Sequence, residues 1–146
     1  MSTDPRNVII ARISAGLTDM LGAVGAHATM RDSGRSSSDF LWAEWPSDLG
    51  AEEACALLAD SLSHAGLFSS VSMKPEGDNI LIEVRGCEFA HLGDFEQADP
   101  GKRSVCFFGY GLIERSLERL TGRRFRVQLV QRDEGTDTCF EIAKAQ

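Results

Sequence analysis

The chain has 146 residues, of which 42% are hydrophobic and 25% are charged, a balance that excludes disorder and indicates one globular domain over residues 1–146. The formal net charge of -7 argues against nucleic acid or an anionic membrane as the partner, because both require a basic surface. No apolar run approaches the length of a membrane span, and the polar N-terminus lacks the pattern of a signal peptide. We therefore expect a cytoplasmic protein that keeps its cysteines as free thiols.

The first third of the chain combines a helical pattern with a polar, serine-rich run. Apolar residues recur at three- and four-residue steps over Val8–Leu21, which is typical of an amphipathic helix, and Ala23–Met30 is compatible with a second helix. The serine-rich run Asp32–Asp39 is predicted to be a mobile loop. The aromatic segment Phe40–Pro46 is short, and its proline limits any strand there to a sheet edge.

The middle of the chain predicts a helix followed by a hairpin. Asp48 can cap a helix that ends at Gly66 and has an apolar face on one side. The segments Phe68–Met73 and Asn79–Arg85 alternate as two strands joined by a turn. The connection Cys87–Lys102 then follows, and loops of this length often serve as lids or binding loops.

The last third predicts a helix over Arg103–Thr121 and a second hairpin. Gly122 supplies the helix C-cap, the first strand alternates over Phe125–Leu129, and the second returns with Phe140 and Ile142 as its apolar residues. The element order is therefore helices, hairpin, helix, hairpin. This order predicts an α+β fold with helices packed on one face of a four-stranded antiparallel sheet.

The segment from Gly86 to Ile142 carries a resemblance to a known family. Its motifs are Cys106-Phe107-Phe108-Gly109-Tyr110-Gly111, then Thr121-Gly122, then Gly135-Thr136-Asp137-Thr138-Cys139-Phe140. Their order resembles the C-terminal half of the 4-vinyl-reductase-like (hydrocarbon-binding) domain, although the last aromatic is shifted by one position. That family is similar in fold to the transport-particle (TRAPP) subunits of vesicle tethering and to the sensor domains of phenol-responsive activators. The resemblance implies a small apolar or aromatic ligand, held in a cavity between helices and sheet.

Zinc is the cofactor that the resemblance to this family suggests. Some members bind zinc through the helix-start cysteine, a Glu-x-x-Cys on the penultimate strand and the final cysteine. Cys106 and Cys139 match the first and last positions, but the middle pair falls on Gln128 and Gln131. Glutamine is a poor zinc ligand. We therefore expect no metal or other cofactor, with Cys106 and Cys139 as the alternative ligands if side chains from Cys87–Lys102 complete the site.

Five residues are candidates for the ligand lining: Trp42, His91, Phe95, Phe107 and Tyr110. Apolar walls would supply affinity, while His91 or Tyr110 would orient one polar atom of the ligand. Core packing is the alternative role for Tyr110, and an ordinary loop position is the alternative for His91. Trp42 and Trp45 are expected to share one aromatic surface on a turn, as pocket wall, dimer contact or core.

Two further features of the predicted C-terminal helix have alternative interpretations. Cys106 lies near the helix N-terminus, which favours a thiolate, with His91 as a base within possible reach; the alternative is a small buried hydrophobe. Gly109 and Gly111 together cost about 2 kcal/mol of helix stability relative to alanine. They indicate either close approach of a ligand or partner helix, or tight packing of helix on sheet.

The sequence favours a non-enzymatic, stand-alone binding module for a small apolar or aromatic molecule, assembled as a homodimer. Two alternatives stay open. One is a non-catalytic protein-interaction module, in which the protein's own side chains would fill the cavity. The other is an accessory protein in tetrapyrrole metabolism, the role that gave the 4-vinyl-reductase family its name, although the sequence contains no cofactor motif that supports it.

Overall fold

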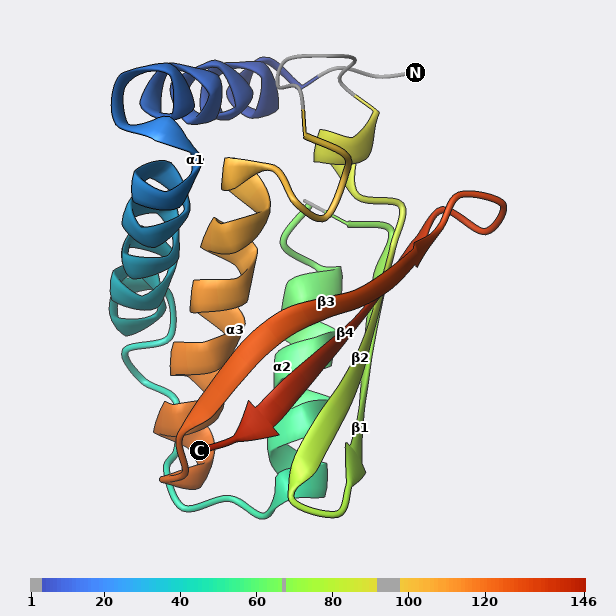
Figure 1. Cartoon of the computed structure of the whole chain (residues 1–146). Helices are drawn as coiled ribbons and strands as arrows, with labels where there is room; N and C mark the ends of the chain where they lie inside the picture. The colour runs from blue at the N-terminus through green and yellow to red at the C-terminus, as the bar shows by residue number, and fades with distance from the viewer. Residues whose placement is uncertain (1–3, 67, 92–97) are drawn as a thin grey trace.

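The computed structural model describes residues 4–66, 68–91 and 98–146, which form three long helices and one sheet. In chain order the elements are α1 (Pro5–Leu41), α2 (Ala51–Ser63), β1 (Ser70–Glu76), β2 (Asn79–Arg85), the 3₁₀ helix η1 (Glu88–Ala90), α3 (Ser104–Thr121), β3 (Phe125–Asp133) and β4 (Thr138–Ala145). Helices α2 and α3 pack on the sheet, and α1 packs on α3 (Figure 1). The prediction of an α+β fold with helices on one face of a four-stranded antiparallel sheet is confirmed.

The sheet has the strand order β1-β2-β4-β3, and every neighbouring pair is antiparallel. Both predicted hairpins are present, and Pro75 lies on the edge strand β1, where a missing backbone N–H is tolerated. The pairing of β3 with β4 is irregular. Leu129 pairs with Glu141 and Gln131 pairs with Phe140, so Val130 is the extra residue of a β-bulge.

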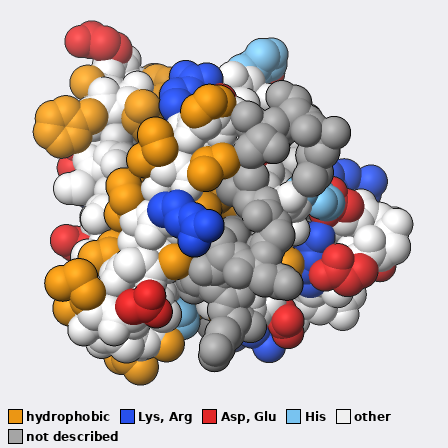
Figure 2. All heavy atoms as spheres, turned by 90° about the horizontal axis from the view of Figure 1, so that it is seen from above, with side chains coloured by type: hydrophobic (Ala, Val, Ile, Leu, Met, Phe, Trp, Pro, Cys, Tyr) orange, Lys and Arg blue, Asp and Glu red, His pale blue; other side chains and the backbone are white. Residues whose placement is uncertain are grey.

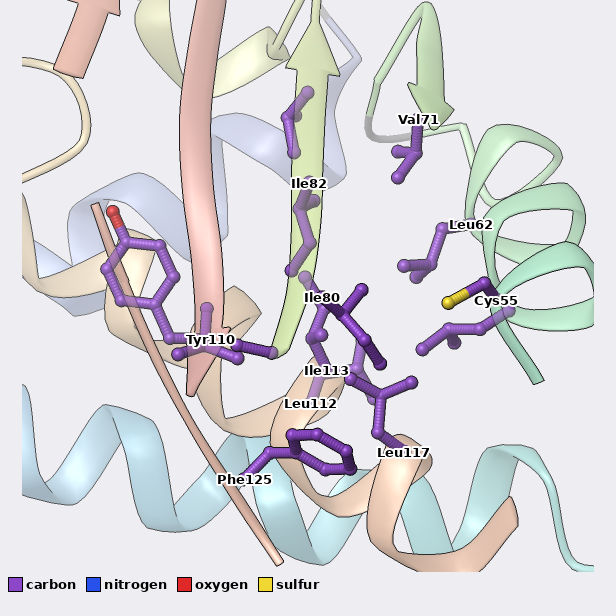
Figure 3. Close-up of a cluster of buried hydrophobic side chains, with 14 of the residues drawn as sticks. Cys55, Leu62, Val71, Ile80, Ile82, Tyr110, Leu112, Ile113, Leu117 and Phe125 are labelled. Atoms are coloured by element: carbon purple, nitrogen blue, oxygen red, sulfur yellow. The ribbon is translucent and has the colours of Figure 1, made fainter. Parts of the chain in front are cut away.

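The main hydrophobic core lies between the sheet and helices α2 and α3. Cys55 and Leu62 of α2 point toward Val71, Ile80 and Ile82 of the sheet (Figure 3). The predicted apolar face of α2 is confirmed, because its buried residues are Ala54, Cys55, Leu58 and Leu62. Burial of such side chains is the main stabilising term of the fold, at roughly 25 cal/mol per Å² of apolar surface.

Helix α1 corrects the prediction for the first third of the chain. The run Asp32–Asp39 is helical and not a loop, because its small residues face α3. A Cβ on Gly34 would lie 2.0 Å from the carbonyl oxygen of Phe108, and the Ser38 hydroxyl lies 2.9 Å from the Ser116 hydroxyl. Tertiary packing thus overrides the weak helix propensity of the serine-rich run.

Gly22 divides α1 into two segments that point in different directions. Its φ of 76° is in the left-handed region that favours glycine. The first segment lies across the top of the molecule and the second runs beside α3 (Figure 1). By length and composition alone, α1 contains an 18-residue stretch that is apolar enough to cross a membrane, in contrast to the sequence analysis. The absence of a membrane partner remains a prediction.

The aromatic segment after α1 forms a turn and not an edge strand. The backbone N–H of Trp45 donates to the carbonyl of Trp42, and the two indole rings stack with centroids 4.3 Å apart. The indole N–H of Trp42 donates to the Ser116 hydroxyl of α3 at 2.9 Å. The shared aromatic surface is therefore confirmed, and it covers part of the main core.

Candidate functional site

A cavity of about 330 Å³ lies between α1, α3, the sheet and the segment around η1. Its volume is at the lower end of the range of small-molecule sites, roughly 300–1,000 Å³. Ile13 lines the cavity and is 56% exposed, so the wall formed by the first segment of α1 is thin at this residue. Most of the described lining is apolar and includes Ile10, Ile13, Leu17, Met30, Phe68, Val84, Phe89, Val105, Phe108 and Ile113.

The two unusual glycines of α3 have different roles. A Cβ on Gly111 would lie 1.9 Å from the carbonyl oxygen of Arg31, so this glycine permits the backbones of α1 and α3 to touch. A Cβ on Gly109 would meet no atom of the described residues within 4 Å, and Gly109 lines the cavity. Close approach of a partner helix therefore explains Gly111, while Gly109 leaves open space in the cavity wall.

Three cysteine thiols face the cavity as neutral groups. Burial raises the pKa of Cys87 and of Cys106 to about 12, and burial also raises the pKa of Cys139. Of the two interpretations of Cys106, the raised pKa favours the small buried hydrophobe over the thiolate, because removal from water outweighs the attraction of the helix N-terminus. These thiols are poor nucleophiles near neutral pH.

Glu141 is the functional residue that the sequence analysis missed. It lies on β4 between Cys139 and Ala143, and all three residues are buried on the face toward the helices. The predicted inward residues Phe140 and Ile142 are only half-buried, so the phase assigned to this strand was off by one position. The small apolar residues two positions on either side of Glu141 are the sequence signal for the correct phase.

The Glu141 carboxyl group is buried without compensation. The residue is 7% exposed, it lines the cavity, and its Oε1 has no hydrogen-bond partner within the described residues. Burial raises the pKa of Glu141 to about 8. The carboxyl group is therefore mostly protonated near neutral pH, because a lone charge in an apolar site is costly.

The raised pKa of Glu141 predicts that its contribution to stability falls as the pH rises. Between its ordinary pKa of 4.5 and the native value of about 8, the unfolded chain releases a proton that the native state keeps. Relative to wild type, Glu141→Gln is expected to gain stability across this window, by at most about 1.4 kcal/mol per pH unit. Urea denaturation of both proteins at several pH values in the window measures the gain. Glu83→Gln, at an exposed position of β2, controls for the loss of one carboxylate, and equal pH dependence of wild type and Glu141→Gln would contradict the assignment.

The structure separates the five residues that the sequence analysis predicted for the ligand lining. Tyr110 lines the cavity and its hydroxyl donates a hydrogen bond to the carbonyl of Gly101. Phe107 is adjacent, with its ring edge-on to Tyr110 at 5.2 Å, but it stacks on His27 at 3.9 Å and is not among the described lining residues.

Of the remaining three candidates, His91 and Trp42 are described, and neither is among the described lining residues of the cavity. The His91 imidazole Nε2 lies 2.6 Å from a carboxylate oxygen of Asp137, at the surface. Trp42 packs with Trp45 on the main core. Phe95 lies outside the described residues.

Comparison with known proteins places the chain in one family. The family described as "Putative rubredoxin C-terminal domain" matches residues 6–145. The chain belongs to this family. A search of curated proteins finds no match for this chain.

A solved structure shares the fold of this chain. It is a trafficking protein particle complex subunit 3 from Naegleria fowleri, covalently bound to palmitic acid. The two chains are 12% identical with a TM-score of 0.67, and the match covers 97% of this chain and 95% of that one. The predicted relationship in fold to transport-particle subunits is confirmed, whereas membership in the 4-vinyl-reductase-like family remains a prediction.

The family name raises the question of an iron site, since four thiolates in a tetrahedron hold iron or zinc. Cys87, Cys106 and Cys139 line the cavity, whereas Cys55 lies on α2 in the main core. Among the described residues, no group of three or more His, Cys, Asp or Glu side chains could hold a metal ion. Cys55 is therefore too far from the other three for a four-thiolate site, and Cys106 and Cys139 gain no third ligand from the part of Cys87–Lys102 that the structure describes.

Proposed function

We propose that this protein is a non-enzymatic module that binds a small apolar or aromatic molecule. The observation that carries the proposal is the cavity of about 330 Å³ with a mostly apolar lining. Phe68, Phe89 and Phe108 contribute aromatic surface to it, and its wall is thin at Ile13. Burial of a ligand against such walls supplies affinity, and the few polar groups fix its orientation.

The transport-particle subunit with palmitic acid supports an acyl chain as one class of occupant. Its covalent attachment is not carried over to this chain, because the thiols of Cys87 and Cys106 are protonated near neutral pH. Reversible binding is the form that the cavity favours. The role in tetrapyrrole metabolism remains a prediction.

A bulky side chain at Gly109 is expected to abolish ligand binding. A Cβ there points into open space in the cavity wall, so the indole of Gly109→Trp would occupy the volume that a ligand needs. We expect the wild-type protein to bind naphthalene or palmitic acid in titration calorimetry. Gly109→Trp should weaken that binding by more than about tenfold, which corresponds to roughly 1.4 kcal/mol.

Gly50→Trp is the matched control, because Gly50 is exposed and a Cβ there also meets nothing within 4 Å among the described residues. Circular dichroism checks that both variants fold, and native mass spectrometry of the freshly purified protein tests for a retained organic molecule. Unchanged affinity in Gly109→Trp, or a wild-type protein that binds neither probe and retains no molecule, would remove the support for a ligand site.

A protein-interaction module is the second candidate, and the exposed apolar surface of α1 favours it. Ile9, Met20 and Val24 are 59%, 82% and 85% exposed. Hydrophobic side chains gather on this end of the molecule (Figure 2). Contiguous apolar surface of this kind often marks a contact with another protein. The homodimer and the cytoplasmic location remain predictions, and light scattering of the purified protein tests the first.

A further inference from the structure

Glu141 is an ionisable residue at a position where the strand pattern calls for an apolar one. It occupies an inward position of β4, between the buried residues Cys139 and Ala143, and its side chain lines the cavity. Among the described lining residues it is the single Asp, Glu, Lys, Arg or His. A carboxyl group at such a place lowers stability unless it has a partner.

The groups that face Glu141 leave its carboxyl group unpaired within the described residues. They are the thiols of Cys87, Cys106 and Cys139 and the phenol of Tyr110, and burial raises the pKa of each of them, so all are neutral near pH 7. The Tyr110 hydroxyl already donates to the carbonyl of Gly101. Arg132 contacts Cys139, but it pairs with Asp137 and Glu134.

The backbone around Glu141 is also irregular. Its partner in β3 is Leu129, and the register shifts immediately after that pair, where Val130 bulges. Bulges are over-represented next to functional sites, where they redirect a side chain or interrupt the pairing. The bulge follows the pair of Leu129 with Glu141, the single carboxyl group of the described cavity lining.

A neutral carboxyl group has one strong O–H donor, whereas thiols donate weakly. A ligand that enters the cavity meets this donor among mostly apolar walls. We propose that Glu141 selects ligands with a carbonyl oxygen on an apolar body, by donating the hydrogen bond of its neutral carboxyl group to that oxygen. This selectivity rests on the proposed ligand-binding function and adds the chemical class of the ligand.

Three naphthyl compounds and two variants test the assignment. Naphthalene, methyl naphthyl ketone and naphthylmethylamine share one apolar body and differ in the polar group. Titration calorimetry is expected to show that wild type binds the ketone roughly fivefold to tenfold more tightly than naphthalene. Glu141→Gln should keep this preference, because its amide N–H still donates. Glu141→Leu should bind both compounds with equal affinity.

The pH dependence gives an independent readout that a merely structural role would not change. In wild type the preference for the ketone should fall as the pH rises through about 8, where Glu141 ionises, and in Glu141→Gln it should stay constant. A preference for the ketone that survives in Glu141→Leu overturns the inference. Tightest binding of the amine by wild type, lost in Glu141→Gln, also overturns it, since that result requires an ionised carboxylate.

The outcomes separate this inference from the proposed function. Naphthalene binding without preference for the ketone overturns the role of Glu141 and leaves the binding function standing. Failure of wild type to bind naphthalene, the ketone or palmitic acid overturns the proposed function itself. Thermal unfolding of Glu141→Leu checks its fold, and we expect it to be at least as stable as wild type, since it removes an unpaired buried polar group.

Discussion

Replacing Gly111 with alanine is expected to lower the free energy of unfolding by about 3 kcal/mol, the upper end of the usual cost of overpacking. The new Cβ would lie 1.9 Å from the carbonyl oxygen of Arg31 and 2.8 Å from its carbonyl carbon. Both atoms belong to the backbone of α1, so a side-chain rotation cannot relieve the clash. The two helices must separate, which opens the interface along α1 and α3. Urea denaturation measures the loss.

Gly109→Ala is the matched control, on the same helix and two positions earlier. A Cβ there meets no described atom within 4 Å, so only the helix propensity of alanine acts. We expect a gain of about 0.5–1 kcal/mol. Opposite signs for the two substitutions would confirm that one glycine serves helix contact and the other serves cavity space. Equal gains would show that α1 and α3 do not touch at Gly111.

The elements that follow simple periodicity could be predicted from the sequence. Both hairpins alternate with period two, and α2 and α3 have apolar faces at helical spacing. These patterns reflect which residues face the core, so they can be recognised in a single sequence without further information. The fold class follows from the order of the elements alone.

The part of α1 over Asp32–Asp39 could not be predicted as helix, because contacts with α3 hold it there while its own residues have weak helix propensity. Gly34 and Ser38 look like loop residues in isolation, yet they are small where the backbone of α3 approaches. Local propensity contains no information about a contact 70 or more residues away along the chain, such as Ser38 with Ser116. The kink at Gly22, in contrast, falls at the one residue that separates the two predicted helical stretches Val8–Leu21 and Ala23–Met30.

The candidate site was predictable only in part. Tyr110 was assigned from its position on the helical face, and it does line the cavity. Glu141 was missed because Phe140 and Ile142 suggested the opposite phase for β4. A buried carboxyl group contradicts the hydrophobic pattern, and such local contradictions are where functional residues are expected. The contradiction becomes visible only when Cys139 and Ala143 are taken as the inward neighbours.

Glu114→Ala is expected to be the most destabilising of the substitutions discussed, with a loss of about 3–5 kcal/mol. The Glu114 side chain of α3 is 1% exposed and joins three elements. Its Oε1 lies 3.2 Å from Arg35, its Oε2 lies 3.5 Å from Arg31, and Oε2 accepts the backbone N–H of Val127 at 2.9 Å. Removal leaves Arg31, whose side chain is 10% exposed, without its carboxylate partner and leaves the Val127 N–H unpaired.

Two controls separate charge burial from simple loss of an ion pair. Asp39→Ala breaks two other pairs between α1 and α3, those of Asp39 with Arg115 and Arg119, but the Asp39 side chain is 50% exposed, so we expect a loss below about 1 kcal/mol per pair. Glu114→Gln keeps the volume and one oxygen acceptor, and it should fall between these two variants. Urea denaturation of the three proteins decides the matter. Similar losses for Glu114→Ala and Asp39→Ala would mean that Arg31 finds water or another acceptor when Glu114 is absent. The interface of α1 with α3 would then depend on the contacts at Gly34 and Gly111 and not on the buried charge.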